Sequence, residues 1–144
     1  MDRRLKTSLL AGLAGLLLPV TGQAAEVSFE RDVMAAITKA GCNIGGCHGN
    51  QTGKASFKLS LWGSDPDFDY DALTRDFFGR RIDTFAPDQS LLLLKGSAAI
   101  AHEGGQRFPK DSLEYKVLRD WIAAGAKRDP TNAPKVVKLE VTPL

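Results

Sequence analysis

The sequence predicts a mostly α-helical domain built around a single core. The chain has 144 residues, of which 43% are hydrophobic, and this is enough for one compact core. Apolar residues recur at spacings of three and four over residues 28–40 and 111–124, which is the period of an amphipathic helix. The net charge of +2 gives no electrostatic footprint for a nucleic-acid-binding protein, so we expect no nucleic-acid partner.

The first 25 residues have the pattern of a secretory signal peptide. Basic residues near the start precede an apolar run at 9–20, and small residues follow up to Ala25. That run is about a dozen residues long, whereas a membrane-spanning helix needs about 20. We therefore expect an exported protein, periplasmic or extracytoplasmic, with no stable membrane span after removal of the signal.

The first predicted helix covers residues 28–40. Ser28 is a suitable N-cap, and Gly41 is a suitable stop immediately before Cys42. A Gly-rich and polar stretch over residues 43–56 predicts a loop. Residues 57–62 then alternate between apolar and polar side chains, which predicts a short extended or strand-like segment.

Three further helical segments are expected. Asp69 is a possible cap for a helix from about residue 70 to residue 78, and the apolar run within 90–95 predicts a buried helical turn. The clearest helix covers residues 111–124, because Asp111 is followed three residues later by Glu114, as in a capping box.

The domain is expected to span residues 26–128. Residues 129–144 form a tail that is Pro-rich at first, and then Val137, Leu139 and Val141 alternate with charged residues. This alternation predicts a single strand, which could be the start of a following β domain.

Both cysteines of the chain lie in one short motif, CNIGGCH at residues 42–48. It reads C-x4-C-H, two residues longer than the C-x-x-C-H signature of haem attachment. Two thiols can bond the vinyl groups on one porphyrin edge while the adjacent histidine ligates the iron, and the two glycines of the motif are expected to let the longer loop fold. The motif predicts haem c attached through Cys42 and Cys47, with His48 as the proximal iron ligand.

Two other interpretations of the motif remain open. In an oxidising compartment Cys42 and Cys47 could form a small disulfide loop, and His48 would then be an ordinary histidine. A zinc site would need four ligands, and the two Cys and two His of the chain do not have the spacing of a common zinc finger. Haem is the preferred interpretation because a disulfide has no need of the following histidine.

Five segments together resemble a known family. They are FERDV at 29–33, CNIGGCHG at 42–49, SLLLLK at 90–95, HEGGQR at 102–107 and DWIAAGA at 120–126. Over residues 27–127 the chain resembles the planctomycete-type cytochrome c domain, which is similar to the class I cytochrome c fold. The resemblance implies helices packed around a covalently bound haem, with Cys42 and Cys47 attaching the haem and His48 ligating its iron. The longer cysteine spacing and the lack of a Met-Pro segment depart from the class I pattern.

The second axial ligand has two candidates in the mature chain. Met34 lies in the apolar stripe of the first helix, which favours core packing. His102 is the only histidine besides His48, and it lies in a Gly-bounded loop where the resembling fold supplies its distal ligand. We expect ligation by His48 and His102, although an exposed loop histidine is the alternative. Two imidazoles favour ferric iron relative to a His/Met pair, so a low potential is expected.

Other charged residues are candidates for supporting roles. Arg80, Arg81 and Arg107 could pair with haem carboxylates or serve as surface charge, and Arg107 is our candidate for cofactor binding. The alternating aspartates at residues 65–71 resemble a calcium loop, but Tyr70 stands where that loop requires glycine, which favours a solvated turn into a helix.

The sequence therefore predicts an exported c-type cytochrome that transfers single electrons, rather than an enzyme by itself. Its expected partners are redox proteins or the downstream domains of a longer chain, because domains that resemble this one often open longer exported proteins. The alternative is a haem-free, disulfide-looped extracytoplasmic domain that binds or scaffolds.

Overall fold

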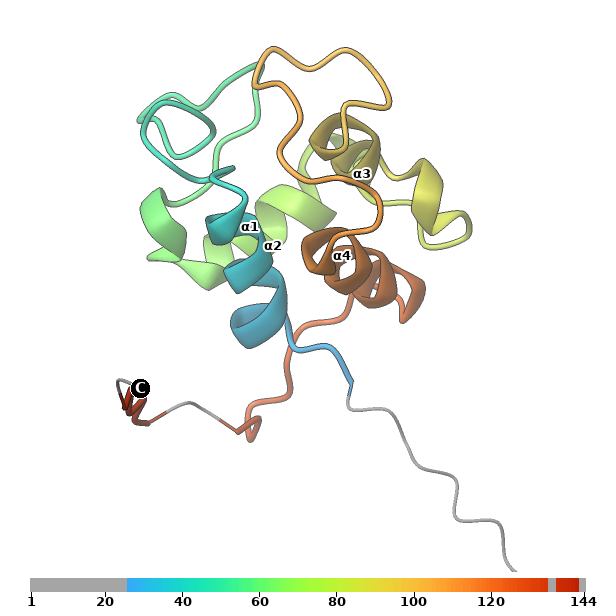
Figure 1. Ribbon diagram of the computed structural model, residues 1–144. Helices are drawn as coiled ribbons and strands as arrows, with labels where there is room; N and C mark the ends of the chain where they lie inside the picture. Colours follow the sequence, from blue (N-terminus) through green and yellow to red (C-terminus); the bar gives the residue numbers. More distant parts are fainter. Residues whose placement is uncertain (1–25, 135–136, 143–144) are drawn as a thin grey trace, which may run out of the picture.

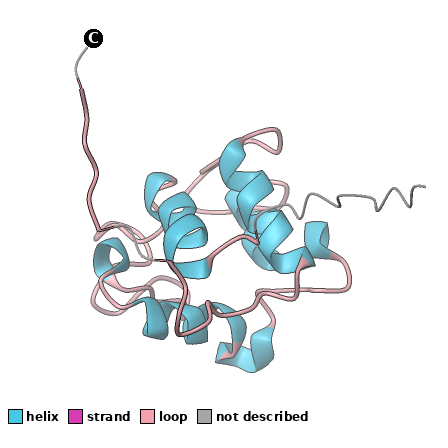
Figure 2. Ribbon diagram, turned by 90° about the horizontal axis from the view of Figure 1, so that it is seen from below, coloured by secondary structure: helices cyan, strands magenta, loops and turns pink. Residues whose placement is uncertain are grey.

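The computed structural model describes residues 26–134 and 137–142, so the expected signal peptide lies outside the described residues. The α-helices are α1 (Met34–Lys39), α2 (Pro66–Thr74), α3 (Leu91–Gly96) and α4 (Leu113–Ala123) (Figure 1). A π-helical turn at Phe29–Val33 leads into α1, and 3-10 turns occupy Leu61–Gly63, Asp76–Gly79 and Pro87–Gln89. The described residues form helices and loops without a β-strand (Figure 2), which confirms the mostly α fold class.

The core forms where the first helical segment packs against α4. Val33 and Ile37 are fully buried on one side, and Leu118 and Ile122 are fully buried on the other. Trp121 of α4 is also buried, and its indole Nε1 donates a hydrogen bond to the carbonyl of Lys127 at 2.9 Å. This packing matches the two amphipathic helices expected from the sequence. Within the described chain, no helix has the length and apolar character to cross a bilayer.

Met34 also lies in the core, as its place in the apolar stripe predicts. The run at 90–95 is confirmed as a buried helical turn, because α3 contains the fully buried Leu93. Trp62 differs from Trp121, since 61% of its surface is exposed in a loop. Only one of the two tryptophans therefore contributes to the core.

The expected helix at 70–78 is placed wrongly at both ends. Helix α2 begins at Pro66, and the side chain of Asp65 accepts a hydrogen bond from the backbone N–H of Phe68 at 3.0 Å. Proline suits the first turn because its missing N–H would be unpaired there. The helix ends at Thr74, and Phe77 and Phe78 follow with φ of +53° and +61°. The Asp-Pro pair is therefore the true start signal.

Two other sequence expectations are also corrected. Of the two alternatives for residues 57–62, the strand is wrong, since only an isolated bridge pairs Lys54 with Phe57 and a 3-10 turn begins at Leu61. Helix α4 takes Ser112 as its N-cap instead of Asp111, with the hydroxyl accepting from the N–H of Tyr115. Glu114 pairs with Lys39 of α1 at 2.5 Å, so it links two helices.

The tail shows no strand in its described part. Residues 137–142 are exposed and irregular, and they contact no partner strand within the described chain. An isolated strand is not stable in water, so alternation alone does not produce one.

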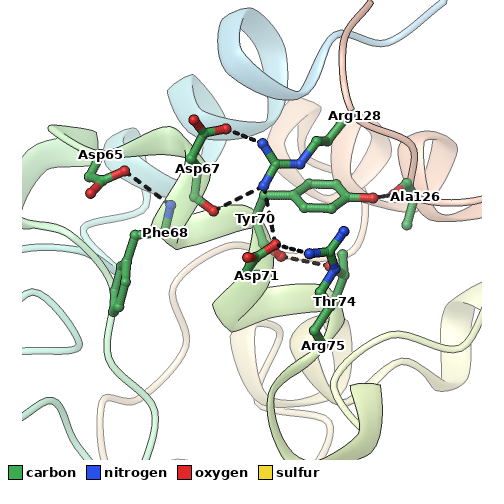
Figure 3. A network of polar contacts seen from close by, with 9 residues as sticks. All are labelled: Asp65, Asp67, Phe68, Tyr70, Asp71, Thr74, Arg75, Ala126 and Arg128. Atoms are coloured by element: carbon green, nitrogen blue, oxygen red, sulfur yellow. Dashed lines mark hydrogen bonds and ion pairs between the residues drawn. The ribbon is translucent and has the colours of Figure 1, made fainter.

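A polar network joins the end of the domain to α2 (Figure 3). The guanidinium of Arg128 lies 4.5 Å from the centroid of the Tyr70 ring and forms ion pairs with Asp67 and Asp71. The Tyr70 hydroxyl donates to the carbonyl of Ala126 at 2.9 Å. A single exposed ion pair contributes little to stability, but in this cluster the Arg128 guanidinium contacts two carboxylates and one aromatic ring at the same time. It holds residues 126–128 beside α2.

Asp129 holds the start of the first helical segment. Its carboxylate accepts hydrogen bonds from the Ser28 hydroxyl at 2.8 Å, the Phe29 N–H at 3.0 Å and the Glu30 N–H at 2.8 Å. These N–H groups have no partner within the helix, and a negative charge is favourable at a helix N-terminus. The folded contacts therefore extend to Asp129.

Replacing Asp129 with Ala should lower the free energy of unfolding by about 1–2 kcal/mol, because a helix cap supplied from the other end of the domain is lost. Urea unfolding of both proteins measures the difference. Lys138→Ala in the exposed tail is the matched control and should leave stability unchanged. Equal stability of the Asp129 variant and the unaltered protein would contradict this role.

Candidate functional site

A cavity of about 730 Å³ lies between the loop after α1, helix α3 and the loop before α4. All five candidate site residues line it, namely Cys42, Cys47, His48, His102 and Arg107. The two loops lie at the end of the molecule away from the first and last described segments (Figure 1). Apolar walls come from Ile37, Phe57, Leu59, Leu91, Leu92 and Phe108. Volume and lining are typical of a small-molecule or cofactor site.

The motif loop folds back on itself, so that its two ends meet. The N–H of His48 donates to the carbonyl of Cys42 at 2.9 Å, and the N–H of Cys47 donates to the carbonyl of Ile44 at 2.9 Å. This closure places His48 and both cysteines on the same cavity. The loop starts directly at the end of α1, where the N–H of Cys42 donates to the carbonyl of Ile37 at 3.1 Å.

The glycines that this loop requires are not the two inside the motif. A Cβ on Gly46 would meet open space, and one on Gly45 would make only an ordinary contact. A Cβ on Gly49 would instead lie 2.0 Å from the carbonyl oxygen of Asn43, and Gly41 has a φ of +71°. The expectation that Gly45 and Gly46 permit the longer loop is therefore wrong. The glycines that flank the motif provide that freedom.

Cys42 and Cys47 are both free thiols in the structure. Burial raises the pKa of the Cys42 thiol to about 11, and the nearby positive charge of Arg107 opposes this shift. The Cys42 thiol is therefore neutral at physiological pH and compatible with the apolar wall.

His48 is held at both its backbone and its side chain. Its Nδ1 lies 3.0 Å from the carbonyl oxygen of Phe57, and its own carbonyl accepts from the N–H of Leu59 at 2.8 Å. Burial lowers the pKa of the imidazole, the bond to Phe57 opposes this, and the charges of His102 and Arg81 lower the pKa further. The neutral ring donates from Nδ1 and keeps the Nε2 lone pair, which is the form that ligates metals.

The imidazole of His102 faces that of His48. The two rings are nearly parallel, with an interplanar angle of 7° and centroids 6.3 Å apart. The Nδ1 atom of His102 lies 2.8 Å from the carbonyl oxygen of Gly105, so both rings use Nδ1 for a backbone carbonyl. Residues 54 positions apart in sequence thus present two imidazoles to one cavity, and no described residue forms a hydrogen bond with Nε2 of either ring.

Arginine side chains surround the cavity in different ways. Arg81 is only 4% exposed, and its guanidinium donates to the backbone carbonyls of Ala72 at 2.8 Å and Ser56 at 3.1 Å. It packs 4.3 Å from the centroid of the Phe57 ring and forms no ion pair with a described carboxylate. Arg81 therefore brings a buried positive charge without an ion pair to the cavity wall, and the charge of Asp76 only partly opposes the lowering of its pKa by burial. Its burial gave no signal in the sequence.

Asp69 is a buried carboxylate and not the helix cap that the sequence predicts. It is 0% exposed, and it accepts hydrogen bonds of 2.6 Å from both the N–H and the hydroxyl of Ser60. Ser60 follows directly on the segment whose Phe57 and Leu59 contact His48. Asp69 thereby attaches that segment to α2.

The aspartates of residues 65–71 bind groups of the protein, and the buried Asp69 departs from the solvated turn that the sequence predicts. Asp65 caps the helix, Asp69 binds Ser60, and Asp67 and Asp71 pair with Arg128. Across the described residues no three His, Cys, Asp or Glu side chains converge, as a site formed from protein ligands alone requires.

Comparison with known proteins adds no relative, since no protein-family model, curated protein or solved structure matches this chain. The functional argument therefore rests on the chemistry of the cavity.

The buried carboxyl of Asp69 predicts a pH-dependent stability. Burial raises its pKa in the folded protein, and the nearby Asp65 adds to the rise while the bonds from Ser60 oppose it. The folded state then binds a proton more tightly than the unfolded state. Asp69 ionisation therefore lowers the free energy of unfolding as pH rises from the ordinary carboxyl range through the raised pKa.

The Asp69→Asn variant has no titratable group at this position, so it should lack this contribution. Urea unfolding of both proteins between pH 3 and pH 7 should show the free energy of unfolding of the unaltered protein falling relative to the variant as pH rises, by an amount on the order of 1 kcal/mol. A difference that is constant over this range, or that changes in the opposite direction, would contradict the assignment.

Proposed function

We propose that this chain is an exported monohaem c-type cytochrome that transfers single electrons. The observation that carries the proposal is the pair of facing imidazoles of His48 and His102, 6.3 Å apart between centroids, in a cavity also lined by Cys42 and Cys47. Export and the likeness to the planctomycete-type cytochrome c domain belong to the same proposal, and both rest on the sequence.

The spacing of the two rings fits two axial ligands of one metal. A metal–imidazole bond is about 2 Å long and the ring centre lies about 1 Å beyond the nitrogen, so opposite imidazoles have centroids roughly 6 Å apart. Haem iron needs only two protein ligands because the porphyrin supplies four. This accounts for a metal site in a chain where no three protein ligands converge among the described residues.

Each residue type at the cavity has a role in holding such a group. Cys42 and Cys47 would attach it by thioether bonds, and His48 and His102 would ligate iron through Nε2. The carbonyls of Phe57 and Gly105 fix the tautomer and orientation of the two imidazoles. Haem supplies reversible one-electron chemistry when bound, and the apolar walls exclude water from it.

Arginine side chains that line this cavity could pair with the carboxylates of the cofactor. A buried cation that forms no ion pair is costly, and a carboxylate against Arg81 would reduce that cost. Arg80 and Arg107 line the same cavity and extend its positive side. Ligation by two imidazoles still favours the ferric state relative to a His/Met pair, so the potential is expected to be low.

The partners we propose are redox proteins or downstream domains of a longer chain. Ligation by both histidines would leave no open position at the iron and no further histidine to act as acid or base, so an electron relay suits this site better than peroxidase-type catalysis.

Covalent attachment is tested by expressing the chain with a cytochrome c maturation system. We expect haem that stays with the polypeptide on a denaturing gel and a Soret band in the purified protein. The double variant Cys42→Ser/Cys47→Ser should lose the covalent haem because no thiol remains to bond it. Colourless protein with a Cys42–Cys47 disulfide would end the proposal and favour a haem-free extracytoplasmic binding or scaffold domain.

Axial ligation by His102 is tested with the His102→Ala variant. The unaltered protein should be six-coordinate and low-spin, and its ferrous form should bind carbon monoxide slowly. The variant should become high-spin and bind carbon monoxide rapidly, because its sixth position is open. An unchanged six-coordinate spectrum in the variant would remove His102 from the iron.

A further inference from the structure

We propose that Arg107 is a positioning residue that clamps the loop carrying His102 to the end of helix α1 and thereby keeps the imidazole of His102 opposite His48. The inference rests on the proposed haem site, and it gives Arg107 a role different from contact with a cofactor carboxylate. Its basis is a pair of hydrogen bonds that joins the two sides of the cavity.

The turn that bears His102 is stabilised mostly within itself. The N–H of Gly105 donates to the carbonyl of His102 at 2.9 Å, and the His102 Nδ1 lies 2.8 Å from the carbonyl oxygen of Gly105. These bonds fix the ring relative to its own turn. They do not fix the turn relative to His48, which belongs to the loop on the other side of the cavity.

The base of this loop is attached to the end of α3. The backbone N–H groups of Arg107 and Phe108 both donate to the carbonyl of Gly96, at 2.8 and 3.3 Å, and Gln106 reaches the carbonyl of Ser97. Helix α3 and the loop that carries His48 are separate segments of the cavity lining. A contact across the cavity is therefore needed to set the separation of the two imidazoles.

Arg107 supplies that contact. Its Nε donates to the carbonyl of Ala40 at 2.8 Å, and its Nη1 donates to the carbonyl of Gly104 at 3.3 Å. Among the hydrogen bonds of the described residues, the bond to Ala40 alone connects the 101–107 loop to the segment that leads into Cys42. The guanidinium thus spans from the haem-attachment side to the His102 side.

The sequence accommodates this clamp at both of its ends. A Cβ at Gly41 would lie 2.5 Å from the Arg107 Nη2, so glycine leaves room for the guanidinium beside Cys42. A Cβ at Gly104 would lie 2.9 Å from the Cε1 atom of His102, so the backbone that Arg107 holds lies directly against the imidazole. The contacts therefore run without a break from Ala40 through Arg107 and Gly104 to His102.

A lysine cannot replace arginine in this role. The planar guanidinium directs separate N–H groups at two carbonyls, whereas an ammonium at the end of a flexible chain offers no fixed fork. A role in charge alone would be preserved by lysine. The variants Arg107→Lys and Arg107→Met therefore separate clamping from charge, and Lys110→Met, which removes an exposed cation three residues further along the same loop, is the matched control.

The experiment uses the full chain matured with haem. The readouts are covalent haem on a denaturing gel, the ferric spin state, and the rate at which the ferrous protein binds carbon monoxide. We expect covalent haem in every variant. Both Arg107 variants should show a high-spin fraction and bind carbon monoxide about tenfold faster, the effect of losing one or two hydrogen bonds that hold the ligand loop. The Lys110 variant should behave as the unaltered protein does.

Two results would overturn the clamp while leaving the haem site intact. One is a carbon monoxide rate and spin state of both Arg107 variants within about twofold of the unaltered protein, since lost clamping bonds would change the rate by more. The other is an Arg107→Lys variant that matches the unaltered protein while Arg107→Met becomes high-spin and binds carbon monoxide faster. The positive charge of Arg107, and not its two hydrogen bonds, would then hold His102 in place. Unaltered protein without covalent haem would instead overturn the proposed function, and the clamp with it.

Discussion

The site depends on the contact between the imidazole of His48 and the carbonyl of Phe57. This carbonyl belongs to a two-residue turn in which Lys54 and Phe57 exchange backbone hydrogen bonds of 2.9 Å. The central residues of the turn, Ala55 and Ser56, both have positive φ, at a cost of about 1–2 kcal/mol each. The surroundings must hold this conformation, and they do so from two directions. Asp69 binds Ser60 on one side, and Arg81 binds the carbonyl of Ser56 on the other.

Two buried charges stand close to this turn, and they differ in how they are compensated. The Asp69 carboxylate is satisfied by two short hydrogen bonds from a single serine, which suits a structural anchor. The Arg81 guanidinium donates to backbone carbonyls, forms no ion pair with a described carboxylate, and lies on the cavity wall. Burial lowers its pKa, and the charge of Asp76 opposes this without forming an ion pair. In the proposed haem site a cofactor carboxylate would supply the ion pair. The pattern of burial thus separates the residue that supports the site from the one that lines the cavity.

The sequence predicts the helices and the site residues better than it predicts what holds them. Cys42, Cys47 and His48 belong to one seven-residue motif, so they can be recognised together. The helical period of the apolar residues predicts the segments that form the core. The convergence of His102 depends on how two loops fold over one cavity, and only the resemblance indicates it. The role of Asp69 is hidden because α2 starts at the Asp-Pro pair of residues 65–66, several residues before the expected start. Arg81 is a candidate from the sequence, but its burial gives no signal, because an arginine that is buried and one that is exposed look alike in sequence.

The two imidazoles are parallel but are not equivalent, because the protein holds them with different numbers of buried contacts. This difference decides which of the two can move more easily. His48 is part of a loop closed by backbone bonds to Cys42 and Leu59, and its ring packs 4.4 Å from that of Phe57. His102 projects from a Gly-rich turn whose neighbours are mostly exposed. Local opening has the lowest cost where few buried contacts must be broken. In the proposed haem site, a change in iron coordination would therefore begin with His102, while His48 would stay in place through its backbone bonds and its packing against Phe57.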